Sequence, residues 1–202
     1  GNSVTSVFTA AEQLSGNPGS DTLRRQFLTS VDESAANFRR TASALGSAAT
    51  GVATEAQGAV TQLNTDLSAL SRINDGLRRA RPGSSNEATL LDERDRLVGT
   101  ISNATDVAIS YDSRGAAIVK TASGDTLVDG TTTATVSVNV AANGTLSYGI
   151  NPGATTLTPG SGALAGLSDA AAHIADQRTA LDTLATQFST ELNAAHQAGL
   201  DA

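Results

Sequence analysis

The residues of this chain best suited to chemistry are a run of acidic side chains. Asp92, Glu93 and Asp95 lie close together, and Asp92 and Asp95 would share one face of a helix, where two carboxylates can hold a cation. Arg94 and Arg96 alternate with these acids, however, and a cation would need further oxygen ligands. We therefore expect the acids to stabilise the first turn of a helix and to form ion pairs. In this interpretation Arg94 or Asp95 pairs across a helical bundle and fixes its register.

The two histidines of the chain do not form a site together. His173 and His196 are 23 positions apart, which on one helix separates them by about 35 Å, so they cannot share a metal ion. The chain has no cysteine and no Gly-x-Ser-x-Gly segment, which excludes a thiolate metal site and a nucleophile elbow. We expect His196 to satisfy carbonyl groups at a helix end. The sequence predicts no catalytic residue, no cofactor and no metal site, and so a protein that is not an enzyme.

Composition narrows the class of protein further. The net charge of -7 argues against a nucleic-acid partner, because phosphate binding needs a clustered positive surface. No run of 18 apolar residues occurs, so no membrane span is expected. Aromatic residues make up only 3% of the chain, so the core must consist mainly of Leu, Val, Ile and Ala. Such a core suits seams between helices better than a deep ligand pocket.

The first half of the chain shows helical spacing of its apolar residues. A short helix is predicted over 3–15, and a second helix begins near Asp21 and ends around Gly46 or Gly51. A third helix follows over 52–81, and its apolar residues recur at intervals of three and four, as in a heptad seam. The seam consists of Val52, Ala56, Val60, Leu63, Leu67, Leu70, Asn74 and Leu77. The polar Asn74 either fixes the register or partner of this seam or marks the point where the seam drifts.

A fourth helix is predicted over 87–103, with Asn86 as its N-cap. The last helix is predicted from about 168 to 198, with Gly199 as its terminator. Between these two helices, the period of the apolar residues changes to two, which predicts a small antiparallel β unit over 105–158. We expect the seams at 52–79 and 170–197 to pack against each other, with the β unit protruding from one end of the bundle.

These elements predict a mainly helical α+β fold, in which an antiparallel helical bundle carries a small antiparallel β domain inserted before the last helix. The predicted parts are the N-terminal part of the bundle at 1–104, the β domain at 105–162 and the return helix at 163–202. Two Asn-x-Thr triplets, Asn103-Ala104-Thr105 and Asn143-Gly144-Thr145, are interpreted as incidental. The second of them contains an Asn-Gly hairpin signal.

Four segments in this layout resemble a known family. They are Asn17-Pro18 with Leu23-Arg24-Arg25-Gln26, then Leu90 to Asp95, Gly162 to Leu167, and Leu192 to Asp201. In their order and placement they resemble the flagellar hook-associated proteins that form the first layer of the hook–filament junction (FlgK type). The resemblance implies structural roles for the motif residues Leu90, Leu91, Asp92, Arg94, Asp95, Gly162, Leu164, Gly166, Leu167, Asn193, His196, Gly199 and Asp201.

The resemblance also implies a function and partners. The protein would be a structural component of the bacterial flagellum, exported through the flagellar channel, extracellular, and built into a ring of its own copies. The hook protein, the adjacent junction protein and a flagellar export chaperone would be its partners, without nucleic acid or membrane. The chain contains no methionine, and we interpret it as a central fragment without the terminal helices that the family uses to polymerise. The isolated fragment is therefore expected to be a monomer.

Two alternatives stay open at this point. The first is flagellin or another axial protein of the flagellum, because these share the plan of helical rod and β domain. The second is an adhesin-like binding module that displays a β head on a helical stalk. Tyr111 and Tyr148 are the only aromatic residues of the predicted β unit, and sugar sites usually need aromatic platforms.

Overall fold

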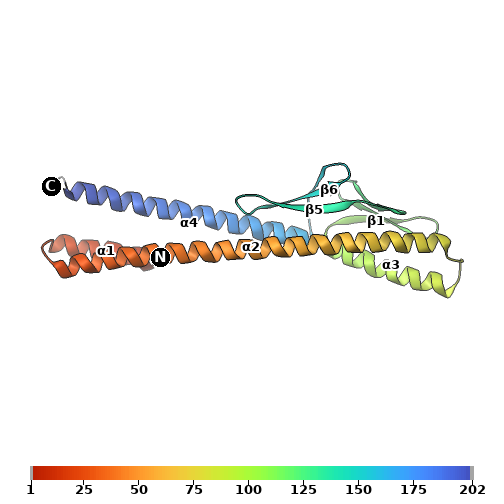
Figure 1. Cartoon of the computed structure of the whole chain (residues 1–202), viewed down its shortest axis with the longest axis horizontal. Helices are drawn as coiled ribbons and strands as arrows, with labels where there is room; N and C mark the ends of the chain where they lie inside the picture. The colour runs from red at the N-terminus through yellow and green to blue at the C-terminus, as the bar shows by residue number, and fades with distance from the viewer. Residues whose placement is uncertain (1, 201–202) are drawn as a thin grey trace. The chain divides into compact units, whose positions relative to one another are not determined.

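The computed structural model describes residues 2–200, which form four helices and seven strands (Figure 1). The chain divides into two compact units. One contains the two ends of the chain, up to residue 48 and from residue 174 onwards, and the other contains residues 49–173. The predicted mainly helical α+β fold with an antiparallel β domain before the last helix is confirmed. The finer division at 1–104, 105–162 and 163–202 stays a prediction.

The prediction that the second helix ends around Gly46 or Gly51 is wrong, because one helix of 59 residues includes both glycines. A glycine inside a helix costs about 1 kcal/mol relative to alanine, which the cooperativity of a long helix outweighs. A Cβ atom added at Gly46 or Gly51 would meet no atom within 4 Å, so neither glycine is required by packing. The helices are α1 (Asn2–Gly16), α2 (Asp21–Arg79), α3 (Ser85–Ala104) and α4 (Gly162–Leu200).

The ends of α3 and α4 also differ from the predictions. The N-cap of α3 is Ser84 and not Asn86, since the Ser84 hydroxyl accepts a hydrogen bond of 3.2 Å from the backbone N–H of Glu87. The Glu87 carboxylate in turn accepts a 2.6 Å hydrogen bond from the N–H of Gly83, which completes a reciprocal cap. Helix α4 begins at Gly162 instead of 168 and extends to Leu200, so Gly199 lies inside its last turn.

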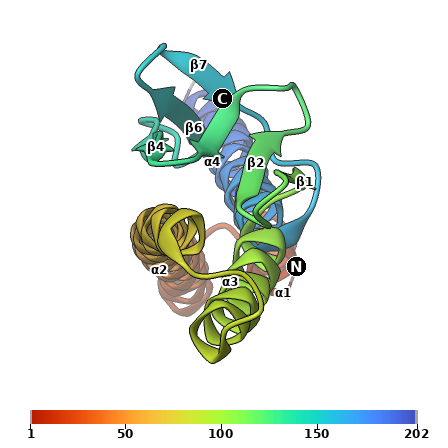
Figure 2. The ribbon, with the colours of Figure 1, turned by 90° about the vertical axis from the view of Figure 1, so that its right-hand side faces the viewer.

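The β domain consists of two antiparallel sheets, which Figure 2 shows on one side of α2 and α3. The larger sheet has the order β1-β2-β3-β4 and the smaller one the order β5-β6-β7. The predicted hairpin at Asn143-Gly144 joins β5 to β6, with Val140 opposite Leu146. The strands are β1 (Val107–Tyr111), β2 (Ala117–Thr121), β3 (Thr126–Asp129), β4 (Thr132–Thr133), β5 (Thr135–Val140), β6 (Leu146–Asn151) and β7 (Thr155–Leu157).

The core of the second unit lies between the apolar seam of α2, the helix α3 and the two sheets. The seam over 60–70, which was expected to pack against 170–197, therefore packs against α3 and the sheets. The sheets lie along α2 through Asn64 and Asn74 and do not protrude from the end of the helices, as was expected. The alternating strands offer an apolar face that is thin and rich in Thr and Gly, so it needs an apolar helix surface to cover it. The buried members of this core include Val60, Leu63, Leu67, Leu70, Leu97, Ile101, Val119, Leu127, Val128, Val136, Tyr148, Ile150 and Leu164.

The first unit has a much smaller interior. Val7, Ala10 and Ala175 are the apolar residues that are buried among its described residues. The rings of Phe38 and Phe188 face each other, with centroids 5.8 Å apart. Within residues 2–200, no helix is both long enough and apolar enough to cross a membrane.

Candidate functional site: the junction between helices and sheets

Two asparagines of α2 hold the two sheets against the helix. Asn74 is fully buried, its Nδ2 donates to the carbonyl of Ala117, and its Oδ1 accepts from the N–H of Ala117, both at 2.8 Å. Asn64 makes the same pair of bonds to Val136 in the smaller sheet, at 2.8 and 2.7 Å. A side-chain amide carries one acceptor and two donors, so it can match both groups of a backbone residue. The two side chains thus fix where each sheet lies along α2.

The contact of Asn64 falls on the open edge of β5. The N–H of Ala141 donates to the carbonyl of Thr145, which shows that the odd-numbered residues of this hairpin face β6. Val136, an even-numbered residue, therefore turns its backbone groups away from β6, toward α2. Asn64 occupies the place of a neighbouring strand at this point, and it leaves no buried backbone group of Val136 unpaired.

Arg94 connects α3 to the turn between β1 and β2. Its guanidinium donates to the carbonyl of Gly115 at 2.6 Å and lies 4.4 Å from the centre of the Tyr111 ring. Asp95 accepts two hydrogen bonds from Arg94, at 2.8 and 2.6 Å, and so orients it. The prediction that Arg94 or Asp95 pairs with a residue across the helical bundle is wrong. The ion pair lies within α3, and the contact to another element goes to the sheet.

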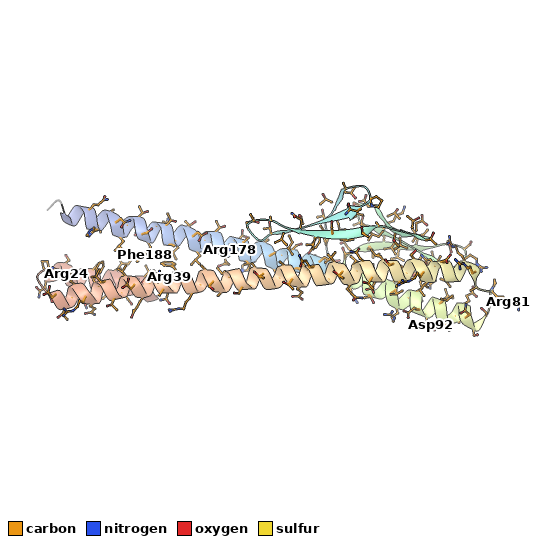
Figure 3. The ribbon with its side chains drawn as sticks, in the orientation of Figure 1. Arg24, Arg39, Arg81, Asp92, Arg178 and Phe188 are labelled. Atoms are coloured by element: carbon orange, nitrogen blue, oxygen red, sulfur yellow. The ribbon has the colours of Figure 1, made fainter. Side chains whose placement is uncertain are left out.

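The remaining acids of this segment lie on the surface in the middle of α3. The expectation that they stabilise the first turn of a helix is wrong, because Glu87 occupies that turn. Asp92 is exposed on α3 (Figure 3), and Glu93 pairs with Arg96 one turn away. The hydrogen bond from Arg96 holds the pKa of Glu93 below its ordinary value. Among the described residues, no three His, Cys, Asp or Glu side chains are grouped so that they could hold a metal ion.

The two leucines of the same motif pack against glycines of other elements. A Cβ atom on Gly76 of α2 would lie 3.2 Å from Leu90. A Cβ atom on Gly115, where φ is +78°, would lie 3.0 Å from Leu91. Leu90 of α3 therefore packs against α2, and Leu91 of α3 packs against the turn between β1 and β2.

The second motif begins where the β domain ends. Gly162 has a φ of +85°, and a Cβ atom on it would lie 2.8 Å from the backbone carbon and oxygen of Ala104. Nearby, Asp106 accepts a 2.8 Å hydrogen bond from the N–H of Gly160. This bond holds the pKa of Asp106 below its ordinary value. The last residue of α3 and the first residue of α4 thus meet, so the β domain starts and ends at one point.

Leu164 fixes the first turn of α4 to the smaller sheet. Its side chain is fully buried, and its carbonyl accepts a buried hydrogen bond of 3.1 Å from the hydroxyl of Tyr148. Burial raises the pKa of Tyr148. Leu167 is half-buried, whereas Gly166 is exposed, and a Cβ atom added there would meet nothing within 4 Å.

The third motif belongs to the first unit. Asn193 and His196 are exposed on α4 and line a groove together with the apolar residues Phe27, Leu28 and Val31 of α2. The expected contact of His196 with the carbonyls at the helix end stays a prediction. Asp201 lies outside the described residues. The first two motifs therefore both lie in the second unit, each at its own contacts between elements, while the third belongs to the first unit.

Sequence reasoning missed three residues of the junction. Arg114 donates to the carbonyls of Ala80 and Leu77, at 2.6 and 3.3 Å, and so caps the C-terminal end of α2. Asn64 and Asp106 were not singled out either, and their neighbours in the sequence give no signal for their backbone partners. Among the described residues, every buried side-chain nitrogen and oxygen has a hydrogen-bond partner.

The contacts of the second unit hold helices and sheets together. They define the class of the protein as a helical scaffold with a docked β domain. The sequence matches the model of the flagellar hook-associated protein FlgK helical domain over residues 1–202, and the chain belongs to this family. The resemblance found in the motifs is therefore confirmed.

A solved structure supports the fold. The flagellar hook junction protein FlgK from Burkholderia pseudomallei is similar, with a TM-score of 0.73 and 23% sequence identity. The match covers 84% of this chain and 32% of that one, so this chain spans about a third of that protein. No curated protein sequence matches the chain.

Proposed function

We propose that this chain is part of a structural component of the bacterial flagellum that forms the junction between hook and filament by self-assembly. The observation that carries this proposal is the match to the family over all 202 residues. It favours a hook-associated protein over flagellin and over an adhesin-like module. In this proposal the protein acts without catalysis and is extracellular, and an export chaperone accompanies it to the flagellar channel.

The surface of the first unit supports assembly. Three large apolar side chains on its helices are about half exposed: Phe8 at 50%, Leu28 at 55% and Leu184 at 48%. A second groove, lined almost entirely by apolar groups, lies between α1, α2 and α4 around Phe27 and Phe188. Exposed apolar surface of this kind is typical of protein contacts. We propose that copies of the protein in a ring, the hook protein and the adjacent junction protein cover it.

Deletion of the gene in its own bacterium tests the function. We expect cells that keep their hooks and lose their filaments, with flagellin released into the medium. Electron microscopy of the cells and blotting of the medium would show this, and the intact gene should restore the filaments. Filaments attached to hooks in the deletion strain would contradict the proposal.

Substitutions in the apolar surface test the contacts. We expect Leu28→Asp and Leu184→Asp to prevent filament attachment without lowering the melting temperature, because both side chains are already half exposed. Ser68→Asp adds the same charge at an exposed position of α2 in the second unit and serves as the control. The isolated chain should have the mass of a monomer, 20.3 kDa, in light scattering. A stable oligomer at micromolar concentration would contradict that expectation.

A further inference from the structure

The two Asn-x-Thr triplets, interpreted above as incidental, differ in the structure. Such triplets are acceptors for N-glycosylation when they lie on an exposed loop. Asn143-Gly144-Thr145 forms the tip of the hairpin between β5 and β6, where Asn143 is exposed. Asn103-Ala104-Thr105 lies at the end of α3, where Thr105 is fully buried. The exposed triplet at Asn143 is therefore a candidate acceptor, whereas the triplet at Asn103 is an incidental match.

The hairpin tip holds the Asn143 amide in a defined turn. Its Oδ1 accepts hydrogen bonds from both the hydroxyl and the backbone N–H of Thr145, at 2.8 and 3.1 Å. The N–H of Gly144 donates to the carbonyl of Ala141 at 2.8 Å, which closes the turn beneath the side chain. The turn is local, because an Asn side chain that bonds the backbone two residues on is a common turn device. It therefore needs few contacts outside residues 141–145.

These two bonds favour chemistry at the amide nitrogen. An amide nitrogen is a poor nucleophile because its lone pair is delocalised onto the oxygen. When the nitrogen loses a proton, the negative charge develops mainly on Oδ1. Two donors already placed at 2.8 and 3.1 Å from Oδ1 would stabilise that charge, as donors do in an oxyanion hole.

The other triplet lacks this arrangement. The Thr105 hydroxyl donates to Asp106 at 3.3 Å, and not to Asn103. The carbonyl oxygen of Asn103 lies only 2.9 Å from the place where a Cβ atom of Gly162 would be. The backbone of this triplet is therefore enclosed by the start of α4, and a transferase could not bind it in an extended form without opening the junction.

We propose that Asn143 is an N-glycosylation site that accepts a sugar from an activated sugar diphosphate. In the reaction, Nδ2 of Asn143 forms a bond to C1 of the sugar, and the C1–O bond to the diphosphate breaks. The diphosphate leaves with the electron pair, and Nδ2 gives up one proton to a base of the transferase. The sugar would extend into solvent from an exposed tip, so no core side chain has to move. The inference is independent of the proposed junction function.

Mass spectrometry of the full-length protein purified from its own bacterium tests the proposal. We expect the peptide with Asn143 to carry the mass of an attached sugar, while the peptide with Asn103 stays unmodified as an internal control. Asn143→Gln and Thr145→Val should each lose the added mass completely, and Thr145→Ser should keep it. Thermal unfolding of the variants checks that the fold is intact. An unmodified Asn143, a sugar on Thr145, or a mass change from deamidation alone would overturn the proposal.

A transfer assay identifies the source of the sugar. The purified unmodified protein is incubated either with the soluble cell fraction and nucleotide-activated sugars, or with the membrane fraction and its lipid-linked sugars. Transfer in the first reaction indicates a nucleotide donor, and transfer in the second a lipid donor. Either result supports the proposal if Asn143→Gln abolishes the transfer. Failure of both reactions on the natural sequence would contradict it.

Discussion

Asn74 makes a deeply buried polar contact at the junction, with 0% of the residue exposed. In the variant Asn74→Asp, the shape stays the same but the donor to the carbonyl of Ala117 becomes a second oxygen. A buried group without its partner costs about 1–3 kcal/mol, and more when charge is involved. We expect the free energy of unfolding to fall by about 3 kcal/mol at neutral pH. Urea unfolding followed by circular dichroism measures this change.

Asn64→Asp is the matched control for that substitution. Asn64 makes the same two bonds to Val136 but is only half-buried, so water can replace the lost donor. We expect a loss of about 1 kcal/mol. Equal losses in the two variants would contradict the role assigned to burial.

A second comparison is between alanine substitutions of Gly162 and Gly166, the two glycines of the second motif, and their effects on stability. Gly162→Ala would place a Cβ atom 2.8 Å from the backbone of Ala104 at a φ of +85°. We expect the variant to lose about 2–4 kcal/mol, from backbone strain together with overpacking. Gly166→Ala meets no atom within 4 Å inside α4, so we expect a gain of about 0.5–1 kcal/mol. Melting temperatures of the two variants check the opposite signs, and a neutral Gly162→Ala would show that α3 and α4 can separate without cost.

The residues of the junction were predictable only in part. Arg94, Gly162 and Leu164 stand in segments that resemble the family, so their importance could be inferred. Asn64 and Asp106 could not be found, because their partners are backbone groups distant in the sequence. A polar residue beside an apolar seam looks the same whether it meets water or the edge of a strand.

Among the elements, periodicity predicted the helices and the main strands, and Asn143-Gly144 predicted one hairpin. The continuity of α2 through Gly46 and Gly51 was not predictable from breaker residues, because their cost is small against a helix of 59 residues. The partner of the seam was also missed. An apolar stripe on a helix predicts that another element covers it. That element can be a sheet as well as a helix.

The β1–β2 hairpin depends on Arg94 of α3. Arg94→Ala removes the 2.6 Å bond to Gly115 and the contact with Tyr111, so we expect a loss of about 1–2 kcal/mol. Amide hydrogen exchange should accelerate in residues 107–121. Arg96→Ala is the control, because Arg96 is exposed and its ion pair with Glu93 lies within α3. An unchanged melting temperature in Arg94→Ala would contradict the role of this contact.

The contribution of Asp106, which lies where the β domain joins α3 and α4, to the stability of the fold should depend on pH. Because the pKa of Asp106 in the folded chain is below its ordinary value, the ionised form favours the folded state. This stabilisation is present above the ordinary carboxyl pKa of about 4 and disappears as the pH falls through the lower folded pKa. We expect Asp106→Asn to be less stable than the natural chain at about pH 6, with the difference shrinking toward about pH 3. Urea unfolding across this range measures it, and a constant difference would contradict the charge argument.

At the scale of the whole molecule, the two units differ in how much apolar surface they bury. The buried core of Leu, Ile and Val side chains lies within residues 60–164, all in the second unit. In the described part of the first unit, the buried apolar residues are Val7, Ala10 and Ala175, of which two are small. Since burial is the main source of stability, the first unit should open more readily.

Hydrogen exchange on the intact chain tests this difference. We expect the amides of α1 and of α4 beyond residue 174 to exchange at low opening free energies, and those of α2 over 60–77 to exchange last. Addition of partner proteins from the hook should slow exchange in the first unit if its apolar surface is where they bind. Uniform protection along the chain would mean that the two units unfold together. In that case the exposed Phe8, Leu28 and Leu184 would belong to a stable surface and not to one that assembly completes.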